Sequence, residues 1–236
     1  MLELNPKLEK PVQDNFLGNN AVYHGYAGFT DRFGHKYTEE ECDKEADLIA
    51  SMRLHIARTY FRWYSYDFDK GVYDWDNNDM QIFYRWCKRL KDRNVDIALQ
   101  AGWNSPGDIL SNSWNGVSPF TVEGDWQKSC ENYAYWVSET VHELIEVRGF
   151  TNIKYLIFFT EPQGGTYNVK TFEMWRDAVK AAHEKLVADN RRHLVKFVGP
   201  NEAFRDTPEM LKWVAENCDD FIDIYSSHTY IWSGNV

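Results

Sequence analysis

The sequence predicts an α/β fold in which parallel strands form a sheet and helices cover its outer face. Short apolar runs alternate with amphipathic helical segments at the spacing of βα units, and about six such units can be counted. No glycine-rich phosphate-binding fingerprint follows the first strand, which argues against a dinucleotide-binding sheet. The expected architecture is a TIM (β/α)8-type barrel, but an incomplete one, because a full barrel takes ~250 residues and eight units.

The first half of the chain supplies three units. Apolar, β-branched and aromatic residues gather in three expected strands, at 22–29, 56–63 and 95–101. Thr38 and the acidic residues after it form a capping box that begins the first helix. The second helix follows a polar loop at 67–76, and its apolar face consists of Met80, Phe83, Tyr84, Cys87 and Leu90. The loop at 102–124 is long enough to be functional rather than merely connective.

The second half adds three more strands, expected at 155–161, 195–199 and 221–227. The clearest helix begins at Trp126, keeps one apolar stripe as far as Ile145 and ends at Gly149. The fourth helix turns inward Trp175, Val179, Ala182 and Leu186. Thr207 is the expected N-cap and Pro208 the first residue of the fifth helix. Its buried residues are expected to be Leu211, Val214 and Ala215.

The composition limits the classes of function. The chain has 236 residues, 43% of them hydrophobic, which suits one globular domain with a large core. We expect an N-terminal extension at 1–20 and a partial barrel domain at 21–236 that lacks strands seven and eight. The net charge of -10 argues against a nucleic-acid partner, since phosphate binding needs clustered Lys and Arg. No apolar run approaches the ~18 residues of a membrane span.

Neither a metal nor a cofactor is expected. The cysteines are far apart and form no CxxC pair, and we expect buried free thiols at Cys42, Cys87, Cys130 and Cys218. His142 and Glu143 lie in mid-helix without a second histidine, so they do not make a metal motif. The N-terminus lacks the basic start and apolar core of a signal peptide, which leaves two options, a cytosolic protein or one secreted with its leader removed.

The most informative stretch is 155–162, an apolar and aromatic run that stops at a lone carboxylate. A buried parallel strand has such a continuous apolar sequence, and in a βα barrel its C-terminal end faces the mouth where chemistry is done. Pro162 cannot donate a ladder hydrogen bond, so the strand stops there. Glu161 is therefore the candidate catalytic residue. The alternative is that Glu161 merely begins a surface loop.

Three strand ends carry a family resemblance. Strand two has Arg58 and Trp63 in the register V-R-x-x-x-x-W, strand four ends in Thr160-Glu161-Pro162, and strand six ends in His228-Thr229-Tyr230. In this order, the motifs resemble the (β/α)8-barrel retaining glycoside hydrolases of clan A, which include cellulases, mannanases and xylosidases. Their usual patterns at strands four and six are N-E-P and H-x-Y. The resemblance covers about 22–230 and implies a hydrolase that acts on β-linked glycosides or polysaccharides.

The resemblance also implies roles. Glu161 would be the acid/base, Arg58 would hold the nucleophilic carboxylate, and His228 and Tyr230 would line the same pocket. Each has a structural alternative: Arg58 could belong to a buried ion pair, and His228 could be a hydrogen-bonded core histidine.

Other candidates extend the carbohydrate site. Thr160 replaces the family asparagine and offers a sugar one hydroxyl instead of an amide's two groups. Trp103, followed by Asn104, looks like a sugar platform in the long loop, although a Trp there could equally cover the barrel rim. Asn201 and Glu202 form a polar pair after strand five, and Glu202 is expected on the substrate side.

The clan's nucleophile stands at the end of strand seven, and the sequence ends before that strand. A carboxylic acid without its partner cannot form the glycosyl-enzyme intermediate, so the chain given is expected to be inactive alone. A homodimer or a complementing C-terminal segment is expected to close the barrel.

Two other readings stay open. One is a non-catalytic carbohydrate-binding or assembly protein with a degenerate glycosidase barrel. The other, a metal-dependent isomerase or lyase, fits less well, since such a site gathers several His, Asp and Glu with ligand spacing.

Overall fold

The structure is a computed structural model. It describes residues 19–23, 35–61, 65–67, 69–101, 120–162, 169–204 and 208–229, with the backbone alone at 19–23, 169, 204 and 229. Within these ranges the architecture is α/β.

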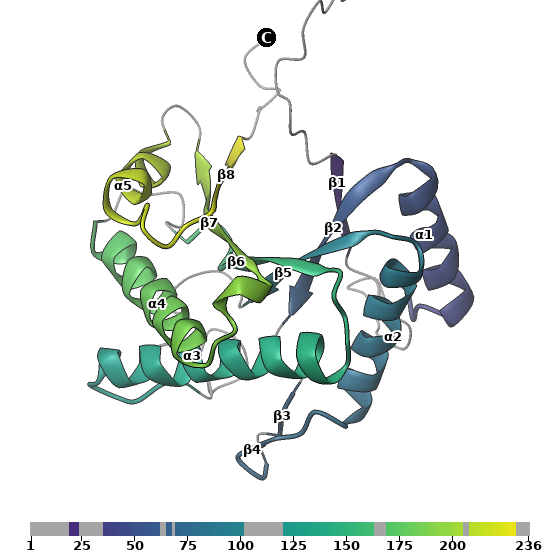
Figure 1. Cartoon of the computed structure of the whole chain (residues 1–236), viewed down its shortest axis with the longest axis horizontal. Helices are drawn as coiled ribbons and strands as arrows, with labels where there is room; N and C mark the ends of the chain where they lie inside the picture. Colours follow the sequence, from purple (N-terminus) through teal and green to yellow (C-terminus); the bar gives the residue numbers. More distant parts are fainter. Residues whose placement is uncertain are drawn as a thin grey trace, which may run out of the picture.

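Six parallel strands form one sheet in the order β1-β2-β5-β6-β7-β8. The sheet curls with its helices on the outside, and β1 and β8 are its two edges (Figure 1). This is the incomplete (β/α)8 barrel that the sequence predicts. The strands are β1 Asn19–Tyr23, β2 Leu54–Phe61, β5 Asp96–Ala101, β6 Ile153–Phe158, β7 Lys196–Phe204 and β8 Ile224–Thr229.

Helices connect successive strands, as a parallel sheet requires. They are α1 Glu39–Ser51, α2 Asn78–Asp92, α3 Trp126–Val141, α4 Val169–Ala188 and α5 Glu209–Asn217, with a 3-10 turn at Arg192–Leu194. The predicted capping box begins α1, because the Thr38 and Glu41 side chains bond each other's backbone N–H. The α3 helix continues as a π-helix, His142–Val147, and Gly149 follows at φ +71°.

Strand alternation sorts side chains between two faces of the sheet. On β2, Ala57, Thr59 and Phe61 are buried under the helices. Ile56 lies on the other, concave face with a smaller apolar cluster, Ala98, Tyr155, Ile157 and Val198. The four cysteines are buried free thiols, as predicted. Among the described residues, no helix is both long and apolar enough to cross a membrane.

Several expectations for local structure are corrected. Residues 67–76 are not simply a polar loop, because β3 Tyr66–Asp67 and β4 Val72–Tyr73 pair as a short antiparallel hairpin. Aromatic contacts support it, since the Tyr73 ring lies edge-on to Tyr66 and stacked on Trp75. In the fifth helix, Ala215 is exposed and Leu211 is half-buried.

Leu211 and Ala215 are not buried because α5 turns a different face towards the core, the one that carries Met210 and Val214, one helical turn apart. Its N-cap is Pro208, whereas Thr207 lies outside the described residues. The β7 strand is also longer than expected, because its pairing with β8 continues past an irregularity between Pro200 and Glu202.

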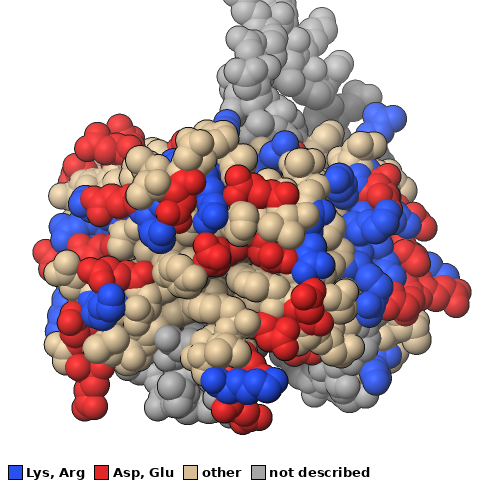
Figure 2. Space-filling model, turned by 60° about the horizontal axis from the view of Figure 1, so that its bottom comes forward, with Lys and Arg blue, Asp and Glu red and all other residues tan. Residues whose placement is uncertain are grey.

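Charged side chains of both signs are interspersed over the face in Figure 2. Part of this pattern is a ladder between α1 and α2. Arg89 bonds Glu39 and Asp43, and Arg93 bonds Asp47. Burial alone would raise the pKa of Glu39, but the hydrogen bonds and charges of Arg89 and Arg85 outweigh it and lower that pKa. The ladder therefore joins α1 to the C-terminal part of α2.

The sheet and a helix approach each other closely at Gly199 on β7. A Cβ built there would lie 2.5 Å from Cζ2 of Trp175, whose indole N–H donates to the Phe158 carbonyl at 3.3 Å. Glycine at this position lets β7 lie directly under the buried indole of α4.

We therefore expect Gly199→Ala to lower the free energy of unfolding by ~1–3 kcal/mol through overpacking. The cost should shrink when Trp175→Phe removes the atoms that the new methyl meets, which urea unfolding in a double-mutant cycle would measure. Equal costs in the two backgrounds would contradict the close approach.

Candidate functional site

Side chains from four strands meet at one end of the sheet. Arg58 comes from β2, Gln100 from β5 and His228 from β8, while Thr160 and Glu161 follow β6 directly. Because all of these strands are parallel, their C-terminal ends lie at the same edge, which is where (β/α) barrels carry their active sites.

Arg58 is the hub of this cluster. Its Nε donates to Gln100 Oε1 at 3.0 Å, and its Nη2 donates to the same oxygen. Its Nη1 lies 3.1 Å from His228 Nε2, and Nη2 lies 3.5 Å from Thr160 Oγ1. The guanidinium also lies over the Tyr60 ring, 5.2 Å from the ring centroid. One cation thus connects all of the strands that build the cluster.

The candidate acid is next to the histidine. Nδ1 of His228 lies 3.2 Å from Oε1 of Glu161, and their side chains are 25% and 34% exposed. The structure therefore brings Arg58, His228 and Glu161 onto one surface that a ligand could reach. The Thr160 hydroxyl belongs to the same cluster, because it accepts a hydrogen bond from Gln100 Nε2.

The end of β6 is held in an unusual backbone conformation. Phe159 and Glu161 have φ values of +61° and +47°, which bulky non-glycine residues seldom adopt. Asn201 secures them from both sides, since its Nδ2 donates to the Phe159 carbonyl at 2.8 Å and its own carbonyl accepts from Glu161 N at 3.1 Å. Such strain persists only where the surroundings fix it, and here it determines how Glu161 is placed.

The expectation that Glu202 faces substrate is corrected. This residue is 2% exposed, and its two carboxylate oxygens accept from the backbone N–H groups of Met210 and Leu211. Glu202 therefore caps the first turn of α5, whose N-terminal amides need an acceptor. Asn201 is buried to the same degree, and its bond to Phe159 gives it a positioning role rather than a place in the pocket.

Three predicted substrate contacts, Trp103, Asn104 and Tyr230, lie outside the described residues, as does Trp63 of the strand-two motif. One residue of the cluster was not predicted from the sequence. Gln100 is fully buried and bonds both Arg58 and Thr160. A signal for it in the sequence is that Gln100 is a polar residue near the C-terminal end of β5, two residues after Ala98, which faces the concave side.

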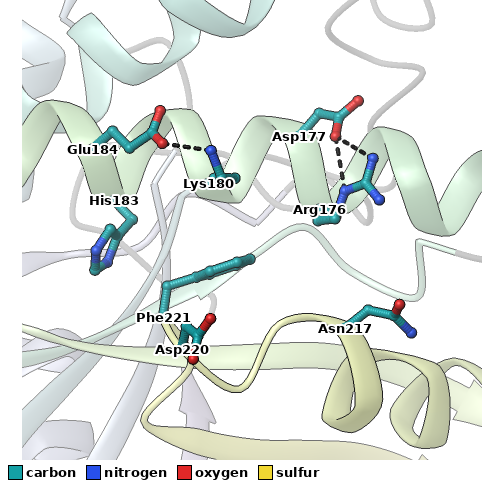
Figure 3. Close-up of a pocket in the computed structure, with 8 residues that line it drawn as sticks. All are labelled: Arg176, Asp177, Lys180, His183, Glu184, Asn217, Asp220 and Phe221. Carbon is teal, nitrogen blue, oxygen red and sulfur yellow. Dashed lines mark hydrogen bonds and ion pairs between the residues drawn. The ribbon is translucent and has the colours of Figure 1, made fainter.

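A hollow of about 610 Å³ lies elsewhere, between α4 and the connection from α5 to β8 (Figure 3). Its charges are largely paired within it, Arg176 with Asp177 and Lys180 with Glu184. No residue of the Arg58 cluster lines this hollow. Across the described ranges, no group of three or more His, Cys, Asp and Glu side chains is arranged to hold a metal ion.

No protein-family model matches the sequence, and a search of curated proteins gives no match. Solved structures do match. A family 39 glycoside hydrolase from Bacteroides cellulosilyticus WH2 has a TM-score of 0.56 and 16% identity, over 90% of this chain and 38% of its own. An exo-β-1,4-mannosidase from Opitutaceae bacterium strain TAV5 has a TM-score of 0.52 and 14% identity, over 80% and 32%.

A GH5-4 broad-specificity endoglucanase from Clostridium longisporum has a TM-score of 0.60 at 9% identity, over 92% of this chain and 63% of its own. The chain therefore shares its fold with these glycoside hydrolases. The chain spans less than two thirds of the length of each of these three structures. At such identities the shared feature is the fold, and one fold hosts many activities.

Asn201 itself has a φ of +60°. We expect Asn201→Ala to lower the free energy of unfolding by ~1–3 kcal/mol, because it removes a buried hydrogen bond and a residue type that tolerates positive φ. Urea unfolding measures the cost, with exposed Asn217→Ala on α5 as the control. The cross-peak between His228 and Glu161 in NMR spectra should weaken in the Asn201 variant. An unchanged stability and cross-peak would contradict the positioning role.

Glu202→Gln tests the helix cap. Burial raises the pKa of Glu202, and the bonds from Leu211 and Met210 offset this in part. A raised pKa means that the folded state binds the proton more tightly than the unfolded state. This stabilising contribution is complete below the ordinary value of 4.5 and is lost as pH rises through the folded-state pKa.

The free energy of unfolding of Glu202→Gln, minus that of the unsubstituted chain, should therefore increase as pH rises from below 4.5 to neutrality. Exposed Glu216→Gln on the same helix is the matched control. A difference that decreases as pH rises would mean that the hydrogen bonds from the α5 amides, rather than burial, determine the direction in which the pKa of Glu202 is shifted.

Proposed function

We propose that this chain is part of a retaining glycoside hydrolase that acts on β-linked glycosides or polysaccharides. The observation that supports the proposal best is the placement of Glu161, fixed by Asn201 at the end of β6 and 3.2 Å from His228. Arg58 and Thr160 stand beside it, and the fold is shared with glycoside hydrolases. Their shared site is a place where a sugar could be bound through hydroxyl groups.

In the proposed mechanism Glu161 donates a proton to the glycosidic oxygen as the bond to the anomeric carbon breaks. Retention requires a second carboxylate ~5–5.5 Å away, which attacks the anomeric carbon. Arg58, which can only donate hydrogen bonds, would hold that nucleophile ionised and correctly aimed. His228 would orient the Glu161 carboxyl group.

The described residues do not supply the second carboxylate. Within the described residues, Glu202 is committed to α5, and the Arg58 cluster contributes one carboxylate, Glu161. We therefore propose that the chain by itself is inactive and that a segment carrying the nucleophile completes the enzyme.

An external nucleophile can test this proposal. With aryl β-glycosides, azide would attack the anomeric carbon, the bond to the aryl oxygen would break, and the product would be an α-glycosyl azide. We expect no turnover without azide and measurable azide-dependent turnover on at least one of the glucoside, mannoside and xyloside. The sugar specificity would emerge from the same panel.

Glu161→Gln should reduce the azide reaction of a poor leaving group far more than that of dinitrophenolate, which needs no proton. The matched control is Glu143→Gln, on the π-helix and outside the cluster. Robust turnover without azide that disappears in Glu161→Gln would overturn the fragment proposal. An equal loss for both leaving groups would overturn the acid role.

A non-catalytic carbohydrate-binding or assembly protein is the second candidate. It is favoured by Thr160, which occupies the place of the family asparagine and is engaged by Gln100. This candidate predicts that β-linked oligosaccharides shift the NMR signals of His228, while azide produces no turnover on any glycoside.

A further inference from the structure

The orientation of Arg58 is decided by a residue to which the proposed mechanism assigns no role. Gln100 presents one amide oxygen to two N–H groups of the guanidinium, Nε and Nη2. The other end of the same amide donates from Nε2 to the Thr160 hydroxyl. Gln100 is fully buried, so its rotamer is fixed by its surroundings as well as by these bonds.

With two of its N–H groups occupied by Gln100, the guanidinium turns Nη1 towards His228 Nε2, 3.1 Å away. Arginine has no acceptor atom, so His228 Nε2 must accept this hydrogen bond. A neutral imidazole that accepts at Nε2 carries its hydrogen on Nδ1. Nδ1 is the nitrogen that lies 3.2 Å from Glu161 Oε1, so the N–H is directed at the carboxylate.

We infer that Gln100 is a positioning residue, which aims Arg58 so that His228 adopts the Nδ1–H tautomer and donates to Glu161. The inference deepens the proposed function, because it supplies the group that orients the acid/base. The tautomer itself does not depend on catalysis. A neutral amide is well suited to this task, since it directs the guanidinium without cancelling its charge.

The chain contains the opposite arrangement as an internal comparison. Arg192 Nε donates to Nδ1 of His183, 3.1 Å away, so this imidazole must carry its hydrogen on Nε2. Burial, and then the charge of Arg192, lowers the pKa of His183, which keeps the ring neutral at neutral pH. His183 lines the hollow beside α4 in Figure 3, and no residue of the Arg58 cluster lines that hollow.

One spectrum can read both tautomers. In the full chain labelled with 15N-histidine, two-bond correlations identify the ring nitrogen that carries no hydrogen, and His228→Gln and His183→Gln assign the two residues. We expect the bare nitrogen to be Nε2 in His228 and Nδ1 in His183. An Nε2–H tautomer at His228 would overturn the inference, whatever the activity of the protein.

The role of Gln100 needs variants. Gln100→Met removes the acceptor with little change in shape, and the Nδ1–H population of His228 should fall while that of His183 stays unchanged. Gln100→Glu keeps an acceptor for Arg58 and should restore the Nδ1–H tautomer. A His228 tautomer that is the same in all three proteins would show that Gln100 does not position Arg58.

A measurement on the unsubstituted chain covers the case in which Gln100→Met does not fold. The Arg58 Nε–H proton should exchange with water much more slowly than that of exposed Arg53, because buried Gln100 accepts its hydrogen bond. Rapid exchange at Arg58 would overturn the inference. If His228 carries its hydrogen on Nδ1 but the protein neither turns over glycosides nor binds sugars, the inference about Gln100 is supported and the proposed function is wrong.

Discussion

Parallel strand pairing is the constraint on which the candidate site depends. In register, β2, β5, β6 and β8 all end at the same edge of the sheet, so residues separated by up to 170 positions become neighbours. Each strand also alternates between its two faces, which places Arg58 on the face opposite the helix-covered Ala57 and Thr59. A polar cluster can therefore form at the mouth without disturbing the apolar core behind it.

The cluster is held by neighbours that do not belong to the pocket. Asn201 stabilises the positive-φ turn at the end of β6, and the next residue, Glu202, caps α5. Two adjacent residues thus bind two different neighbours, the end of a strand and the start of a helix. A polar pair at a strand end therefore does not by itself indicate substrate contact.

Hydrogen-bond directionality gives the cluster its order. Arg58 only donates, so every atom that it hydrogen-bonds must accept. His228 therefore accepts at Nε2, carries its hydrogen on Nδ1 and donates it to Glu161. The same rule gives His183 the opposite tautomer beside Arg192. The position of one guanidinium, rather than the identity of the histidine, determines which ring nitrogen carries the hydrogen.

The sequence by itself determined the α/β class, the alternation of six strands with five helices, the buried cysteines and the strand ends that bear Arg58, Glu161 and His228. These features are local, since apolar periodicity, caps and turn residues are properties of short segments. Only the tertiary structure decided the burial of Glu202, the turn held by Asn201 and the role of Gln100. Each depends on contacts between strands or helices far apart in the chain, and no local pattern records which face of a strand end, or which distant partner, a polar side chain will meet.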